Sequence, residues 1–334
     1  MLAKRAEVLY NIGMKPMLRR LALLLSLLML LAGCSGLHAC LHADEPDERQ
    51  AERNALSEKL LSARPTAFPA VSEPALVVTV IDVGQGDGIL LVSPAGKTML
   101  VDAGPSGSFD RIDDTLRRFG VARLDVVVAT HPHEDHIGSM AAVLDAYPVG
   151  AFYTIADEQP TALYTAMIAA LARNGCPVYP VESGMTIPWD DACTVTVLGP
   201  VSYENEHVEL NDRSAVLHVR FGDTSVLLTG DAEAEAERRI LDSFPKSMLK
   251  ANVLKLGHHG SSSSTGYSFF LAVDPDFAVA SCGKDNDFGH PHLETLSLLY
   301  ENHTAFYRTD LDGSITFRLD GTNVSVDPLR KETP

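Results

Sequence analysis

Residues 124–138 read LDVVVATHPHEDHIG, and this stretch decides the fold and the site that we expect. An apolar run of strand type, residues 124–130, is followed within six positions by three imidazoles and a carboxylate: His131, His133, Asp135 and His136. Such ligands on a rigid strand end suit zinc or manganese. His131 and His133 project from one side of the extended turn, whereas Asp135 and His136 reach another place. We therefore predict two adjacent metal positions.

Strand and helix patterns alternate around this stretch, from about residue 74 onward. The predicted strands are residues 77–83, 88–93, 98–101, 124–130, 195–198, 215–221, 225–228, 252–256, 277–281, 314–319 and 323–326. The predicted helices are residues 110–119, 137–146, 161–174, 232–244, 267–273 and 293–302. Strand clusters in both halves, with helices between them, predict an α/β fold. Two sheets pack face to face with helices outside, a four-layer αββα sandwich.

The N-terminal segment differs from the rest of the chain. Basic residues precede the apolar run 21–31, which ends at Ala32, Gly33 and Cys34. A run of this length is too short to span a bilayer and is typical of a secretory signal. Residues 31–34 resemble the bacterial lipobox, which implies lipidation of Cys34; an ordinary signal peptide is the alternative. We expect a lipoprotein signal peptide at 1–33, a tether at 34–75 and a folded domain at 76–330, with the protein exported and lipid-anchored to the cell envelope.

Export has consequences for charge and for the cysteines. Without residues 1–33 the chain has 22 basic and 43 acidic residues, a net charge of −21, which opposes non-specific binding to nucleic acid or anionic lipid.

Besides Cys34 and Cys40, the chain has Cys176, Cys193 and Cys282. An oxidising compartment permits pairing, and Cys176 with Cys193 is the pair that we consider, because both flank short strand-like runs. The alternative is that both are small buried apolar residues.

Three further motifs follow the order found in a known family. Together with the histidine cluster, residues 98–104 (TMLVDAG), 227–231 (LLTGD) and 254–260 (LKLGHHG) resemble the metallo-β-lactamase superfamily. The resemblance implies that Asp102 orients the histidine loop from behind and that Asp231 bridges two metal ions. It also implies a last histidine ligand, for which His258 is favoured over His259 by similarity to members with a histidine, an aromatic residue and a glycine at this point. His259 is then a pocket or core residue.

The third motif of the superfamily departs from the pattern in this chain. It normally supplies a histidine to the first metal ion, but residues 210–217 (LNDRSAVL) contain none. We expect two zinc ions, or manganese in their place, with weaker binding at the position left to His131, His133 and Asp231. His207, a little upstream, is a candidate replacement.

Three stretches resemble one group within the superfamily, the extracellular domain of the bacterial competence DNA-uptake protein ComEC. They are residues 81–88 (IDVGQGDG), 211–217 (NDRSAVL) and 281–292 (SCGKDNDFGHPH), and the similarity covers residues 76–320. The glycine-containing first stretch leads into a strand rather than a helix, which argues against a nucleotide-binding loop. We expect it to direct Gln85 and Asp87 toward the metal pocket, and the second stretch to place Asn211 and Ser214 there.

The third stretch offers groups for substrate. Lys284 can contact an anion, and His290 or His292 can donate a proton to a leaving group; the alternative is a polar loop that caps the helix after it. The resemblance therefore implies a hydrolase that uses metal-bound hydroxide, with Asp135 essential and Lys284 or Arg213 as anion contact. Its expected substrate is a phosphodiester, in single-stranded DNA or an envelope polymer. Other hypotheses are hydrolysis of another ester, a lactone or a β-lactam, and a non-catalytic, envelope-anchored accessory protein of DNA uptake.

Overall fold

The computed structural model describes residues 45–157, 159–202 and 208–328 of the chain. The chain divides into two compact units, Met1–Ala55 and Leu56–Pro334, and the predicted domain lies in the second. The helix α3 (Glu45–Ser62) begins in the first unit and ends in the second. The signal peptide, Cys34, Cys40 and His207 lie outside the described residues, so the predictions about them stay predictions.

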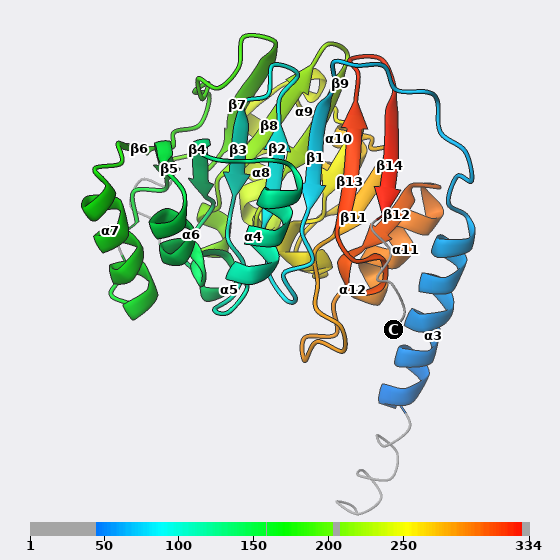
Figure 1. Ribbon diagram of the computed structural model, residues 1–334. Coiled ribbons are helices and arrows are strands. Elements are labelled where there is room, and N and C mark those ends of the chain that lie inside the picture. Colours follow the sequence, from blue (N-terminus) through cyan, green and yellow to red (C-terminus); the bar gives the residue numbers. More distant parts are fainter. Residues whose placement is uncertain (1–44, 158, 203–207, 329–334) are drawn as a thin grey trace, which may run out of the picture. The chain divides into compact units, whose positions relative to one another are not determined.

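The second unit contains two β-sheets (Figure 1). The larger has the order β14-β13-β1-β2-β3-β4-β5-β6. Its strands are β1 (Leu76–Val80), β2 (Ile89–Val92), β3 (Thr98–Val101), β4 (Leu124–Ala129), β5 (Val149–Thr154), β6 (Val178–Pro180), β13 (Ile315–Leu319) and β14 (Val324–Pro328). The strands β3 to β6 are parallel to one another, whereas the remaining pairs of this sheet are antiparallel.

The smaller sheet has the order β12-β11-β10-β9-β8-β7. Its strands are β7 (Cys193–Gly199), β8 (Val216–Phe221), β9 (Thr224–Leu228), β10 (Val253–Lys255), β11 (Phe277–Ala280) and β12 (Ala305–Arg308). Here β9 to β12 are parallel, and β7, β8 and β9 are antiparallel. Each sheet therefore has a parallel half whose strands end at a common edge.

Helices cover the outer face of each sheet, which confirms the predicted four-layer αββα sandwich. The helices besides α3 are α4 (Phe109–Arg118), α5 (Glu134–Ile137), α6 (Met140–Ala146), α7 (Ala162–Asn174), α8 (Ala234–Ser243), α9 (Lys246–Leu249), α10 (Tyr267–Val273), α11 (Leu293–Glu301) and α12 (Thr309–Asp312), with 3-10 turns η1 (Asn211–Arg213) and η2 (Gly257–Gly260). One apolar cluster joins both sheets, and it includes Val78, Leu217 and Phe317. A second joins the larger sheet to α4, α6 and α7, and a third joins the smaller sheet to α8, α10 and α11.

The end of the predicted tether belongs to the second unit. Leu60 is buried, and Arg64 donates two hydrogen bonds to Asp312, at 2.8 and 2.5 Å, and one to the Phe306 carbonyl at 2.6 Å. The Arg64 guanidinium also lies 4.2 Å from the centre of the Tyr307 ring. Within the predicted tether at 34–75, Leu60 and Arg64 thus contact other residues of the second unit.

The cysteines in the described residues are unpaired. Cys176, Cys193 and Cys282 are all free thiols. The two strand-like runs expected to lie side by side are β6 and β7, which belong to different sheets. Burial raises the pKa of the Cys193 thiol, with a further contribution from Asp190, to about 12, so this thiol stays protonated. Within the described ranges, no helix has the length and apolar character needed to cross a membrane.

Candidate metal centre

The predicted site residues follow strands that end at one edge of the two sheets. Asp102 follows β3, the His131–His136 stretch follows β4, Asp231 follows β9, and His258 and His259 follow β10. Parallel pairing of β3 with β4 and of β9 with β10 sets these ends side by side. Figure 1 shows α5, which carries Asp135 and His136, at the lower edge of the sheets.

Four of these side chains form one compact group. The ligand atoms of Asp135, His136, Asp231 and His259 all lie within 4.8 Å of one another. His259 Nε2 is 3.0 Å from Asp135 Oδ2 and 3.4 Å from Asp231 Oδ1. His136 Nε2 is 3.2 Å from the same Asp231 oxygen. Two imidazole nitrogens and two carboxylates in this arrangement form a ligand set for a divalent ion.

Unpaired atoms in the group test whether it fits a metal ion. His136 Nε2 and Asp231 Oδ1 are buried, and neither has a hydrogen-bond partner among the described residues. Buried polar atoms without partners carry a free-energy penalty, which a cation between them removes. The residues present therefore fit a divalent ion.

Asp102 holds this arrangement from behind. Its Oδ2 accepts hydrogen bonds from His136 Nδ1 and Thr130 Oγ1, both at 2.7 Å, and its Oδ1 accepts one from the Thr130 amide at 2.8 Å. Because Asp102 accepts the Nδ1 proton of His136, Nε2 is the nitrogen that faces the metal position, where a metal ion would replace its proton. Asp102 has a φ of +59°, a left-handed conformation that is uncommon for residues other than glycine and recurs at functional sites.

His131 and His133 lie on the other side of Asp231. Their facing nitrogens, His131 Nε2 and His133 Nδ1, are 2.9 Å apart, and His131 Nε2 is 3.9 Å from Asp231 Oδ2. Thr130 Oγ1 donates to Asp102, so it accepts the proton of His131 Nδ1 at 3.1 Å. Burial, followed by the charge of His136, lowers the pKa of His131 well below its ordinary value, so the ring is neutral. His131 and His133 are not members of the compact group.

The structure places His259, not His258, in the compact group. His259 is buried, whereas the side chain of His258 is 27% exposed and its Nε2 lies 3.8 Å from Asp231 Oδ2. Two adjacent left-handed residues, with φ of +46° and +57°, turn the rings in different directions. The preference for His258 over His259 at this position is therefore corrected.

Charge balances explain the protonation of the group. Burial lowers the pKa of His136, but the carboxylates of Asp231, Asp102 and Asp135 outweigh it and hold that pKa well above its ordinary value. Burial raises the pKa of Asp231, but His136 and His259 bring it well below its ordinary value. Before a metal ion binds, the centre thus pairs ionised carboxylates with protonated imidazoles.

A buried ion pair lies behind His259, and the sequence did not reveal it. Lys255 Nζ is 2.7 Å from Asp87 Oδ2, and both side chains are fully buried. Asp87 Oδ1 lies 3.5 Å from His259 Nδ1, which donates to the Ser281 carbonyl at 2.9 Å. Asp87 thus faces the back of the His259 ring, as Asp102 faces that of His136. The available signal was a lysine inside an apolar strand, which is rare without a buried partner.

The loop 283–292 contributes one group that faces the centre. The centroid of the His290 ring lies 5.4 Å from that of the His258 ring and 6.2 Å from that of the His259 ring. Gln85 Oε1 accepts from the Gly283 amide at 3.0 Å, and its Nε2 lies 3.4 Å from His290 Nδ1. Burial, with the charges of His259, His292 and His258, lowers the pKa of His290 to about 3. Its neutral ring therefore keeps Nε2–H as a donor.

The other two predicted residues of this loop are placed differently. His292 accepts a hydrogen bond from the Ser262 amide at Nδ1 and donates to the Phe288 carbonyl at Nε2, both at 3.0 Å. Both of its nitrogens hold loops together, so the proposed proton donor is His290 and not His292. Lys284 is exposed on the same loop.

The departure in the third motif has a structural role. Ser214 Oγ accepts from the Asp231 amide at 3.1 Å and lies 3.3 Å from His131 Nδ1. Asp212 Oδ1 accepts from the amides of Glu233 and Ala236, both at 3.0 Å, and so caps α8. This leaves Asp231 outside the helix, which begins at Ala234 and not at residue 232 as predicted.

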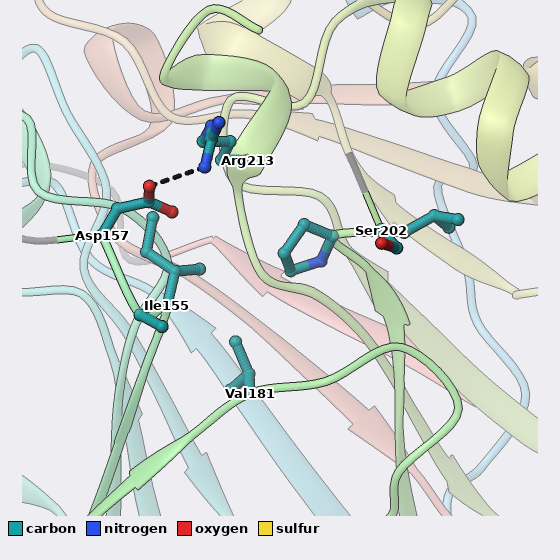
Figure 2. Close-up of a pocket in the computed structure, with 8 residues that line it drawn as sticks. Ile155, Asp157, Val181, Ser202 and Arg213 are labelled. Carbon is teal, nitrogen blue, oxygen red and sulfur yellow. Dashed lines mark hydrogen bonds and ion pairs between the residues drawn. The ribbon is translucent and has the colours of Figure 1, made fainter. Parts of the chain in front are cut away.

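A pocket lies beside this motif, next to the ends of β5, β6 and β7. Figure 2 shows the side chains of Arg213 and Asp157 next to each other at one side of the pocket, joined by an ion pair with Nη1 2.6 Å from Oδ1. The volume of the pocket is about 290 Å³, and aliphatic side chains, including Ile155 and Val181, form part of its wall. Because Arg213 is already paired, its charge is balanced locally, which weakens its predicted role as an anion contact.

Comparisons with known proteins identify the family to which the chain belongs. A family model described as the metallo-beta-lactamase superfamily matches residues 81–284. ComE operon protein 3 of Bacillus subtilis is 31% identical over 265 residues, which cover 72% of this chain and 33% of that protein. Competence protein ComA of Neisseria gonorrhoeae is 33% identical over 272 residues, covering 81% and 36%. Recombination protein 2 of Haemophilus influenzae is 31% identical over 253 residues, covering 74% and 29%. The chain thus spans about a third of the length of these relatives.

Proposed function

The chain belongs to the metallo-β-lactamase superfamily, and from this we propose that it is a metal-dependent hydrolase whose substrate is a phosphodiester. The observation that carries the proposal is the group of Asp135, His136, Asp231 and His259, in which His136 Nε2 and Asp231 Oδ1 are buried without a hydrogen-bond partner in the described part of the chain. A purely structural cluster would pair these atoms within the protein.

The residues around the centre have separable roles in this proposal. Asp135, His136, Asp231 and His259 would hold the ion, while Asp102 and Asp87 orient the two histidines from behind. A bound divalent ion supplies Lewis acidity and lowers the pKa of a water molecule. His290, neutral and with Nε2–H free to donate, is positioned to stabilise a leaving oxygen. Lys284, exposed on the same loop, can attract an anionic substrate.

Two observations support a phosphodiester over a β-lactam or a lactone. The histidine that the third motif normally supplies is absent, and Ser214 lies beside His131 instead. The curated relatives carry names that refer to competence and recombination, processes that involve DNA. Single-stranded DNA is therefore the first polymer to test, and an envelope phosphodiester the second. Export and a lipid anchor on Cys34 belong to the same proposal.

Turnover of bis-p-nitrophenyl phosphate by the purified chain, with zinc or manganese added, tests the proposal. We expect hydrolysis by the wild type and only background rates for Asp135→Asn and His259→Asn, with both variants folded by circular dichroism. His303→Asn, which replaces an exposed histidine that also has positive φ, is the control and should keep the wild-type rate.

Parallel assays with single-stranded DNA, a lactone and a cephalosporin give the substrate class. Hydrolysis of the lactone or the cephalosporin alone would overturn the phosphodiester assignment. A folded, metal-loaded chain that hydrolyses none of these compounds would favour the non-catalytic accessory protein.

A further inference from the structure

The two oxygens of Asp231 face two different pairs of histidines. Its Oδ1 lies 3.2 Å from His136 Nε2 and 3.4 Å from His259 Nε2. Its Oδ2 lies 3.9 Å from His131 Nε2 and 3.8 Å from His258 Nε2. Two atoms bound to one zinc ion at about 2.1 Å are at most about 4.2 Å apart, so both distances to Oδ2 allow a shared ion. His131 and His258 thus face Oδ2 of Asp231 as His136 and His259 face its Oδ1.

A carboxylate contacts Nδ1 of His258, as the Asp102 carboxylate contacts Nδ1 of His136. His258 Nδ1 lies 2.8 Å from Glu233 Oε1. A carboxylate on Nδ1 keeps the proton on that nitrogen and leaves Nε2 bare toward Asp231, as in metal-ligating histidines. The same Glu233 oxygen accepts hydrogen bonds from Asn211 Nδ2 and Ser263 Oγ, both at 3.1 Å. The His258 ring is therefore oriented by a supported carboxylate rather than by chance contact with solvent.

Asn211 connects His258 with the departure in the third motif. The superfamily pattern places a metal-binding histidine in this stretch, and here Asn211 donates instead to the carboxylate that orients His258. The backbone also favours a specific role for His258, because its φ of +46° is unusual for a residue with a side chain. Left-handed residues other than glycine cost free energy and persist where the surroundings hold them.

We propose that His258 supplies the ligand that the third motif lacks, so that the chain binds two divalent ions. His131, His133 and His258 hold one ion with Asp231 Oδ2. The compact group holds the other through Asp231 Oδ1. This inference rests on the proposed function only for metal binding, not for the substrate.

Metal content gives a test that does not depend on activity. The full chain is loaded with Zn²⁺, freed of excess by gel filtration, and analysed for zinc per chain and for affinity by competition with a chromophoric chelator. We expect two zinc ions in the wild type and one in His258→Asn, and none in the His258→Asn/His259→Asn double variant. His303→Asn is the matched control, because it also replaces a left-handed histidine by asparagine, which tolerates this conformation, and it should retain both ions.

A second variant covers the case in which His258→Asn perturbs folding. Glu233→Gln keeps His258 but weakens its support, and it should lower affinity at one position by about 10- to 100-fold while leaving the other unchanged. Two ions bound by His258→Asn with wild-type affinities, or a single ion in the wild type, would overturn the inference. A wild type without zinc would overturn both proposals. Two ions without phosphodiester turnover would overturn the proposed function and leave the second metal position intact.

Discussion

Replacing Asp102 by asparagine tests whether a buried carboxylate sets the metal affinity of the centre. Asparagine keeps the size of the side chain and tolerates the φ of +59°, so the backbone should remain in place. The amide oxygen can still accept from the Thr130 amide, now 2.8 Å from Oδ1. The amide nitrogen, however, would face the proton on His136 Nδ1, which lies 2.7 Å from the replaced oxygen.

The expected magnitude follows from this conflict between two donors. A neutral His136 ring relieves it by carrying its one proton on Nε2, the atom that faces the ion, so metal binding must displace that last proton. Changes to residues that orient a ligand typically weaken metal binding about 10- to 100-fold, or about 1.4 to 2.8 kcal/mol. A lost hydrogen bond to a charged acceptor also lowers the free energy of unfolding by about 1.5 to 3 kcal/mol.

Competition with a chromophoric chelator measures the affinity, and urea denaturation of the metal-free protein measures the stability. Asp274→Asn serves as control, since Asp274 also has a left-handed φ, +51°, but caps α10 at an exposed position. It should change the affinity less than twofold. Wild-type zinc affinity in folded Asp102→Asn would refute the view that this carboxylate fixes the tautomer of His136.

Three further changes probe the supports of the centre, each measured by denaturation. Gly86→Ala should unfold the domain or displace Asp135, because an added Cβ would lie 2.2 Å from the Asp135 carbonyl oxygen. The control Gly96→Ala has nothing within 4 Å of the added Cβ and should lower the free energy of unfolding by only about 1 kcal/mol. Equal losses of stability in the two variants would contradict this prediction. Lys255→Met should lower the free energy of unfolding by about 3 to 5 kcal/mol, because it leaves its partner carboxylate buried and unpaired, and a cost under 1 kcal/mol would contradict the ion pair. Burial raises the pKa of Glu237 to about 8, so its stabilising contribution is complete below about pH 4.5 and is lost as pH rises through 8. Stability should therefore fall from pH 6 to 8 by up to about 1.4 kcal/mol per unit, and Glu237→Gln should flatten this slope, whereas an identical slope in the variant would show that another group titrates.

The sequence predicted the four layers because they depend on local patterns of apolar residues, and it predicted the candidate ligands partly from such patterns and partly from the resemblance to the superfamily. The histidine cluster after the strand at 124–130 predicts His131 as a ligand from the residues alone, whereas Asp102 and Asp231 are predicted only through the resemblance of their motifs to the superfamily. The sequence did not predict β5 or β12, two parallel strands whose apolar runs are interrupted by Gly150 in the first and ended by Arg308 in the second. It also placed the start of a helix at residue 137, where the structure has the end of α5; α6 begins only at Met140, after Gly138, which approaches other backbone so closely that a Cβ would lie 2.2 Å from the Ser106 amide nitrogen.

The order of His258 and His259 shows where sequence patterns cease to be informative. The two residues are adjacent and chemically identical, so only the path of the backbone decides which ring faces which oxygen of Asp231. That path depends on two successive left-handed residues between Gly257 and Gly260. The supports are equally non-local: Glu233 and Asp87 reach the two rings from distant parts of the chain.

The balance of buried charge indicates why these supports occur together. Asp87, Asp102 and Asp231 are each almost fully buried, and Lys255 is the buried cation that offsets one of them. Burial opposes ionised carboxylates, so the remaining negative charge must be matched by protonated imidazoles or by metal ions. An imidazole nitrogen that carries a proton cannot bind a metal ion, so protons and metal ions compete for the histidine nitrogens beside these carboxylates. The carboxylates behind the histidines therefore both orient the ligands and supply the charge that makes a divalent ion the better counterion.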